Sequence, residues 1–210
     1  MIIKGIGLKD FKKVGDTGDS FYTTFDGVNE YVNMGSDASL DFETNEAWSI
    51  SGWASAADLT SPTFMLSRKL TAGAPYQGYV IKTGEGGASN LTFKIATSGG
   101  GIHVSSSPLV NNTLYHIVAT YDGSQTVGGL NLYINGVLDN AATSGTTAGL
   151  IGYTGNFIVG ASKDGTVLWN GIIDEVAAFS KELTPVEVNT IYSMGRHKLV
   201  NYGIIPNLVS

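Results

Sequence analysis

The carboxylates and histidines of this chain are the residues from which catalytic or metal-binding chemistry could be built. Glu43 and Glu46 lie in an expected loop, and Asp174 and Glu175 are adjacent in an alternating, strand-like segment. Adjacent strand residues point to opposite faces, so Asp174 and Glu175 should not form a catalytic pair. The histidines (His103, His116 and His197) are isolated, and His116 is expected to pack within a strand. Because no paired acid and base and no histidine-rich spacing occurs, we expect the protein not to be an enzyme.

Aromatic side chains near expected turns are candidates for binding a sugar, because sugars dock on exposed aromatic faces beside amides and carboxylates. The segment 162–170 adds mixed polar groups next to Trp169. The alternative is that Trp53 and Trp169 fill the interior of the fold, since tryptophan is usually well buried. The candidate glycan-binding residues are Trp53, Tyr79, Tyr153 and Trp169.

The elements that would position these residues are short strands. With 28 glycines and only 14% charged residues, the 210-residue chain favours strands and tight turns over helices. Alternating segments recur about a dozen times, and Asn135-Gly136 between two of them is a strong hairpin signal. This pattern predicts an all-β fold, either a two-sheet antiparallel sandwich or a barrel.

One helix is expected, directly after the last strand. Residues 171–179 alternate as a strand does, and Thr184 then provides a helix cap with Pro185 at the first helical position. Glu187, three residues after the cap, completes a capping box. Gly195 is a plausible residue for ending this short C-terminal helix.

Charge and composition exclude several classes of partner. Residues 21–192 carry six basic and fifteen acidic side chains, which argues against nucleic acid. We find no apolar run near 18 residues and expect no membrane insertion. There is no cysteine, hence no disulfide framework.

The first ten residues do not resemble a secretory signal, so either a signal was trimmed or the protein leaves a cytoplasm by another route.

Five fragments, in order along the chain, suggest a family: 25–32, 48–53, 114–123, 130–137 and 171–176. In this order they resemble the laminin-G-like jelly rolls of the concanavalin A-like lectin/glucanase superfamily, across residues 20–193. The resemblance implies a two-sheet antiparallel jelly-roll sandwich with one short C-terminal helix. Members of the family mostly bind glycans, proteins or surfaces.

The resemblance also bears on metal and catalysis. Relatives hold a structural calcium near their adjoining first and last strands, which makes Asp26 and Asp174 the expected ligands for Ca²⁺ here. The alternative is that Asp26 forms an Asx turn and Asp174 accepts backbone hydrogen bonds. Glucanases of the superfamily carry two glutamates around an aspartate on one strand, and this chain lacks that motif.

Three regions are expected: an N-terminal arm (1–19), the laminin-G-like domain (20–193) and a C-terminal tail (194–210). Residues 1–20 and 193–210 are basic, and such arms tie subunits of assembled particles to one another. We therefore expect a non-enzymatic virion surface protein, for capsid decoration or attachment, whose partners are other virion proteins, itself or a host-surface glycan. The alternative is a secreted or cell-surface carbohydrate-binding domain with disordered termini.

Overall fold

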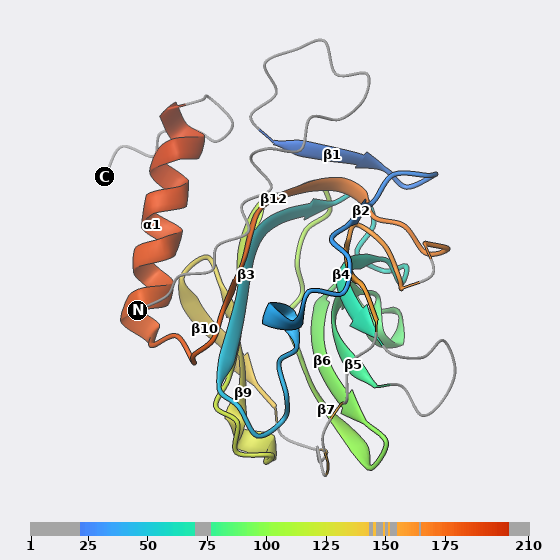
Figure 1. Cartoon of the computed structure of the whole chain (residues 1–210). Helices are drawn as coiled ribbons and strands as arrows, with labels where there is room; N and C mark the ends of the chain where they lie inside the picture. The colour runs from blue at the N-terminus through green and yellow to red at the C-terminus, as the bar shows by residue number, and fades with distance from the viewer. Residues whose placement is uncertain are drawn as a thin grey trace.

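In the part of the chain that it describes, the computed structural model is a two-sheet sandwich with one α-helix outside it (Figure 1). It describes residues 22–69, 77–142, 145, 149, 151, 155–163 and 165–201. Each sheet has six strands, and all strand pairs within them are antiparallel. The all-β prediction is confirmed, and of the two architectures left open by the strand pattern the sandwich is the correct one.

Sheet A contains the first and last strands of the sequence side by side. Its strands, in spatial order, are β1 (Thr23–Asp26), β12 (Asn170–Phe179), β3 (Trp48–Ala56), β8 (Tyr115–Tyr121), β9 (Leu130–Ile134) and β10 (Val137–Ala141). The expected hairpin joins β9 to β10, where Asn135 and Gly136 both have positive φ, 53° and 82°, as a type I′ turn requires.

Sheet B faces sheet A across the core. Its strands, in spatial order, are β2 (Val32–Asn33), β11 (Phe157–Val159), β4 (Phe64–Lys69), β5 (Gly78–Thr83), β6 (Leu91–Thr97) and β7 (Gly100–Ser105). Within the described connections lie three single-turn 3₁₀ helices: η2 (Ala38–Leu40), η3 (Glu85–Gly87) and η4 (Val127–Gly129).

Trp48 of β3 is at the centre of the core between the sheets. Its ring centroid lies 4.9 Å from that of Tyr79 and 5.5 Å from that of Phe93, both from sheet B. It also lies 5.9 Å from the centroid of Tyr121 in sheet A. The sequence alternation explains this placement, because Trp48 and Ile50 face inward while Ser49 and Ser51 face outward. Burying such an aromatic contributes about 1.5–3 kcal/mol of folding free energy.

Helix α1 (Pro185–Asn201) lies along the outer face of sheet A, on the side away from sheet B (Figure 1). The expected capping box is present: Thr184 N donates to Glu187 Oε2 at 2.9 Å, and Glu187 N donates to Thr184 Oγ1 at 3.3 Å. Val188 is fully buried against Val118 and Tyr133 of the sheet. We call this covered surface the helix-covered face.

The prediction that the helix ends at Gly195 is wrong, because α1 continues to Asn201. Gly195 is buried inside the helix, and a Cβ at this position would lie 2.6 Å from Trp53 Nε1. The glycine therefore permits close packing of helix on sheet and does not terminate the helix. The expected boundary between domain and tail, at 193/194, falls within α1, while the arm 1–19 lies outside the described residues.

Candidate functional site

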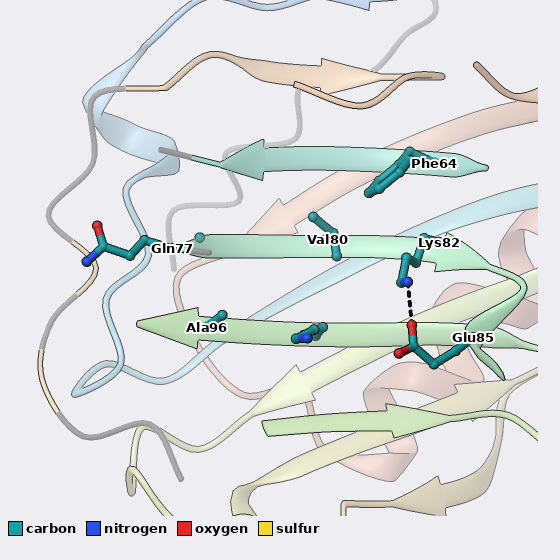
Figure 2. A pocket seen from close by; sticks show the side chains of 8 residues that line it. Phe64, Gln77, Val80, Lys82, Glu85 and Ala96 are labelled. Atoms are coloured by element: carbon teal, nitrogen blue, oxygen red, sulfur yellow. Dashed lines mark ion pairs between the residues drawn. The ribbon is translucent and has the colours of Figure 1, made fainter. Parts of the chain in front are cut away.

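An open groove crosses the outer face of sheet B over β4, β5 and β6 (Figure 2). Its volume is about 300 Å³, at the lower end of the range for ligand pockets. We call it the sheet-B groove. It is lined by Phe64, Gln77, Gly78, Val80, Lys82, Glu85, Lys94 and Ala96.

The alternation of β5 decides which of its residues reach the groove. Tyr79 and Ile81 point into the core, so Val80 and Lys82 point outward beside Phe64 of β4. The surface of the sheet is recessed where Gly78 pairs with Ala96 of β6, because glycine has no side chain and alanine has only a methyl group. The groove is thus a depression formed by small residues between larger ones.

Two lysines give the groove its charge. Lys82 forms an ion pair with Glu85, drawn in Figure 2, and the hydrogen bond from Lys82 lowers the pKa of the Glu85 carboxyl despite its partial burial. The nearby charges of Lys94 and His103 lower the pKa of Glu85 further. Among the described residues, Lys94 makes no hydrogen bond or ion pair of its own, and it is half-buried.

The groove also offers the other groups that bind sugars. Phe64 is partly exposed at its rim and presents an aromatic surface to the groove (Figure 2). Gln77, directly before β5, provides an amide that can donate and accept. Together with the Lys82–Glu85 pair, these groups can hydrogen-bond hydroxyls while the aromatic ring contacts the apolar face of a sugar.

Three of the four aromatics predicted to bind glycans do not face the groove. Trp169 and Tyr79 are fully buried; Trp169 Nε1 donates to the Ser55 carbonyl and Tyr79 Oη donates to the Leu40 carbonyl. Trp53 is only 3% exposed, because α1 covers it. These three rings have no free face for a sugar. The alternative that the tryptophans fill the interior is correct for Trp169, which lies between the sheets, whereas Trp53 is buried on the outer face of sheet A under α1. Tyr153 lies outside the described residues.

The two expected calcium ligands are not brought together. Asp26 pairs with Asn170 in the β1–β12 ladder, whereas Asp174 lies four residues further along β12, about 13 Å at the rise of a strand. Asp26 Oδ1 accepts from Val28 N at 2.8 Å, which is the Asx turn considered as the alternative. The two carboxylates therefore do not fit one shared Ca²⁺ ion. Among the described residues, no group of three or more acidic, histidine or cysteine side chains could hold a metal.

The expectation that Asp174 and Glu175 face opposite sides of β12 is wrong. The register between β12 and β3 shifts between Asp174 and Ala177, and Glu175 takes a left-handed φ of 48°. Such a bulge interrupts strict alternation. Asp174 pairs with Trp53, and Glu175 Oε2 lies 3.2 Å from where a Cβ of Gly195 would be, so both residues are on the helix-covered face.

His116 packs within a strand, as expected. It lies on β8, with its ring centroid 5.0 Å from that of Trp53 and 5.8 Å from that of Tyr192 of α1. Desolvation lowers its pKa to about 4, so the ring is neutral at pH 7. Its role is structural, since the helix-covered face leaves it almost no contact with solvent.

The sequence analysis missed the residues that line the groove. One signal was available: four of the six basic residues between 21 and 192 fall on β4, β5 and β6, namely Arg68, Lys69, Lys82 and Lys94. Of these, Lys82 and Lys94 line the groove. Their convergence depends on which strands are neighbours, and that order does not follow from the sequence of each strand.

The fold agrees with a known family. A family model described as the concanavalin A-like lectin/glucanases superfamily, of laminin G type, matches residues 26–189. The chain belongs to this laminin-G-like family. No curated protein matches the chain in sequence. In the part of the chain that the structure describes, no helix has the length and apolar character needed to cross a membrane.

Solved structures share the laminin-G-like fold at low sequence identity. The botulinum neurotoxin serotype G binding domain aligns with a TM-score of 0.57 at 13% identity, over 83% of this chain and 46% of the other. The chain thus spans less than half of that toxin domain. The CBM40 of a Ruminococcus gnavus IT-sialidase, bound to α2,3-sialyllactose, aligns at 0.56 and 14% identity, over 81% and 98%. Domain 4 of the Geobacillus stearothermophilus arabinanase AbnA, with arabinotriose, aligns at 0.55 and 20% identity, over 77% and 72%.

Proposed function

We propose that this laminin-G-like chain is a carbohydrate-binding module that takes its ligand into the sheet-B groove. The observation that carries the proposal is the groove itself, a depression of about 300 Å³ lined by an aromatic ring, an amide and charged side chains. Two structurally similar domains, the CBM40 and the arabinanase domain, were solved with saccharides. Their fold supports the proposal, although their sequence identity is too low to transfer a ligand.

We further propose that the module binds its ligand without hydrolysing it. Glycosidases generally need two carboxyl groups, about 5–9.5 Å apart, on either side of the scissile bond. Among the described residues that line the groove, Glu85 is the one carboxylate, and Lys82 holds it in an ion pair. A bound oligosaccharide should therefore be recovered intact after prolonged incubation.

The assignment to a virion surface stays a prediction, as does the alternative of an extracellular or cell-surface protein. The virion assignment depends on the arm 1–19 and on the end of the chain beyond Asn201, which lie outside the described residues. Carbohydrate binding in the groove would serve attachment in either setting.

Calorimetric titration against a panel of neutral and acidic oligosaccharides tests the proposal. Ala96→Phe should abolish binding, because Ala96 is on the groove floor and a larger ring would fill the depression. The control is Val137→Phe at a 65% exposed position of β10, in the other sheet, which should bind as the wild type does. Folded wild-type protein that binds no saccharide, or a folded Ala96→Phe variant of unchanged affinity, would refute the proposal.

A further inference from the structure

We propose that the ligand of the sheet-B groove is a saccharide bearing a single carboxylate, and that Lys94 binds this carboxylate. The inference rests on the proposed carbohydrate-binding function and goes further by naming the chemical class of the sugar. The inference depends on the positions of Lys82 and Lys94, on which of them forms an ion pair, and on the net charge of the groove.

The lysines of the groove stand out against an acidic chain. Residues 21–192 carry fifteen acidic and only six basic side chains, yet Lys82 and Lys94 both face this depression. They are diagonal neighbours on β5 and β6, since Val80 pairs with Lys94 and Lys82 pairs with Thr92. Such neighbours lie roughly 7–8 Å apart, so one ligand on this face can reach both side chains.

Protection of a sheet edge does not explain Lys94. Lysines on edge strands prevent unwanted pairing with other chains. β6, however, is paired on both sides, with β5 and with β7. Lysine is also disfavoured in strands, so its position in the middle of β6 needs another reason. A ligand on the outer face of the strand supplies that reason.

The two lysines are not equivalent. Glu85 neutralises Lys82, while Lys94 makes no hydrogen bond or ion pair with the described residues although it is half-buried. His103 of β7 pairs directly with Lys94 and extends the same outer face. Lys94 is therefore the ammonium group positioned to gain a charge-assisted hydrogen bond from an incoming carboxylate.

The charge balance indicates one carboxylate and not a polyanion. Among the described residues that line the groove, Lys82, Glu85 and Lys94 together carry one net positive charge. One carboxylate on a sugar ring matches this charge. A heavily sulfated chain or a nucleic acid would bring several negative charges close to Glu85 and to an acidic surface, where they would be repelled.

The hydroxyls and apolar face of the same sugar have partners nearby. Gln77 and the Lys82–Glu85 pair border the floor and can exchange hydrogen bonds with hydroxyls. Phe64 borders it on the β4 side (Figure 2). A carboxylate held by Lys94 would leave the ring of the sugar between these groups.

Calorimetry with two matched ligand pairs tests the inference. The first pair is an oligogalacturonide and its methyl ester, and the second is sialyllactose and lactose. The wild type should bind the acid member of at least one pair roughly tenfold to a hundredfold more tightly, the range for a hydrogen bond to a charged group. This preference should decline as salt rises. The pair that shows it identifies the source of the carboxylate, a uronic or a sialic acid.

The variant Lys94→Met removes the charge and keeps much of the side chain. It should lose the preference for the acid while retaining the affinity for the neutral partner. Lys181→Met, at an ion pair with Glu187 near α1, makes the same change of net charge away from the groove and should keep the preference. Equal binding of acid and neutral sugars by the wild type would overturn the inference and leave the proposed function standing. A preference for the acid that survives Lys94→Met would also overturn the inference and leave the proposed function standing. Wild-type protein that binds no saccharide would refute the proposed function itself.

Discussion

The outer faces of the two sheets differ in what covers them. On sheet A, α1 covers Trp53, His116 and Val118, so polar and aromatic groups there contribute to stability. On sheet B, Val80, Lys82 and Lys94 border an open groove. The same alternation of strand residues produced both faces. Whether an outward-facing aromatic or charged residue is structural or available to a ligand depends on an element elsewhere in the chain.

The largest expected contrast is in stability. Trp53→Ala removes a buried ring beneath α1 and should lower the free energy of unfolding by about 3–5 kcal/mol. Phe64→Ala on the open face should cost about 1 kcal/mol or less, because that ring is partly exposed. Urea denaturation of the two variants measures the difference. Equal losses would show that α1 does not close the outer face of sheet A as described.

The helix-covered face should also make stability depend on pH. The pKa of His116 is about 4 in the folded protein and about 6.5 in an unfolded chain, so between these values the unfolded state binds a proton that the folded state does not. Stability therefore falls as the pH drops from about 6.5 to about 4, by about 3 kcal/mol in total.

Denaturation midpoints at pH 7 and pH 5 measure the first part of this loss, before most carboxylates titrate. The variant His116→Leu should be much less sensitive over that range, whereas His103→Leu on the open face should retain the sensitivity of the wild type. Identical pH dependence of wild type and His116→Leu would contradict the burial of the histidine.

A smaller effect is expected at Gly195. By helix propensity alone, Gly195→Ala would stabilise the protein by about 1 kcal/mol. The new methyl group, however, would lie 2.6 Å from Trp53 Nε1, and overpacking of this kind costs about 1–3 kcal/mol. We expect a net loss of about 1 kcal/mol in thermal or urea denaturation. A stabilised variant would mean that α1 packs less closely on Trp53.

Sequence reasoning succeeded where the information is local. Alternation located most strands, and the Thr184–Glu187 capping box and the Asn135-Gly136 turn both formed as expected. It failed where two distant segments meet. The sequence around Gly195 predicts a helix end, and only the close contact with Trp53 in the folded protein explains why the glycine is needed inside the helix. The bulge at Glu175 is visible only in the pairing of β12 with β3. Lys82 and Lys94 line one groove because β5 and β6 are paired.

The prediction that Trp53, Tyr79 and Trp169 bind glycans failed for a related reason. Trp169 and Tyr79 are near turns, which suggests exposure, but both point between the sheets and are fully buried. Lysines, which the sequence analysis did not consider, were the better guide to the open face, because a charged side chain seldom enters a core without a partner.

The most direct test of the binding proposal is to map the ligand on the protein. Backbone amide shifts of ¹⁵N-labelled protein should be followed by NMR during titration with an oligogalacturonide and with sialyllactose. At least one of them should shift amides of β4, β5 and β6, centred on Val80, Lys94 and Ala96, and leave those of α1 and β8 in place. Shifts centred on α1, or no shifts with either saccharide, would contradict the assignment of the sheet-B groove as the carbohydrate site.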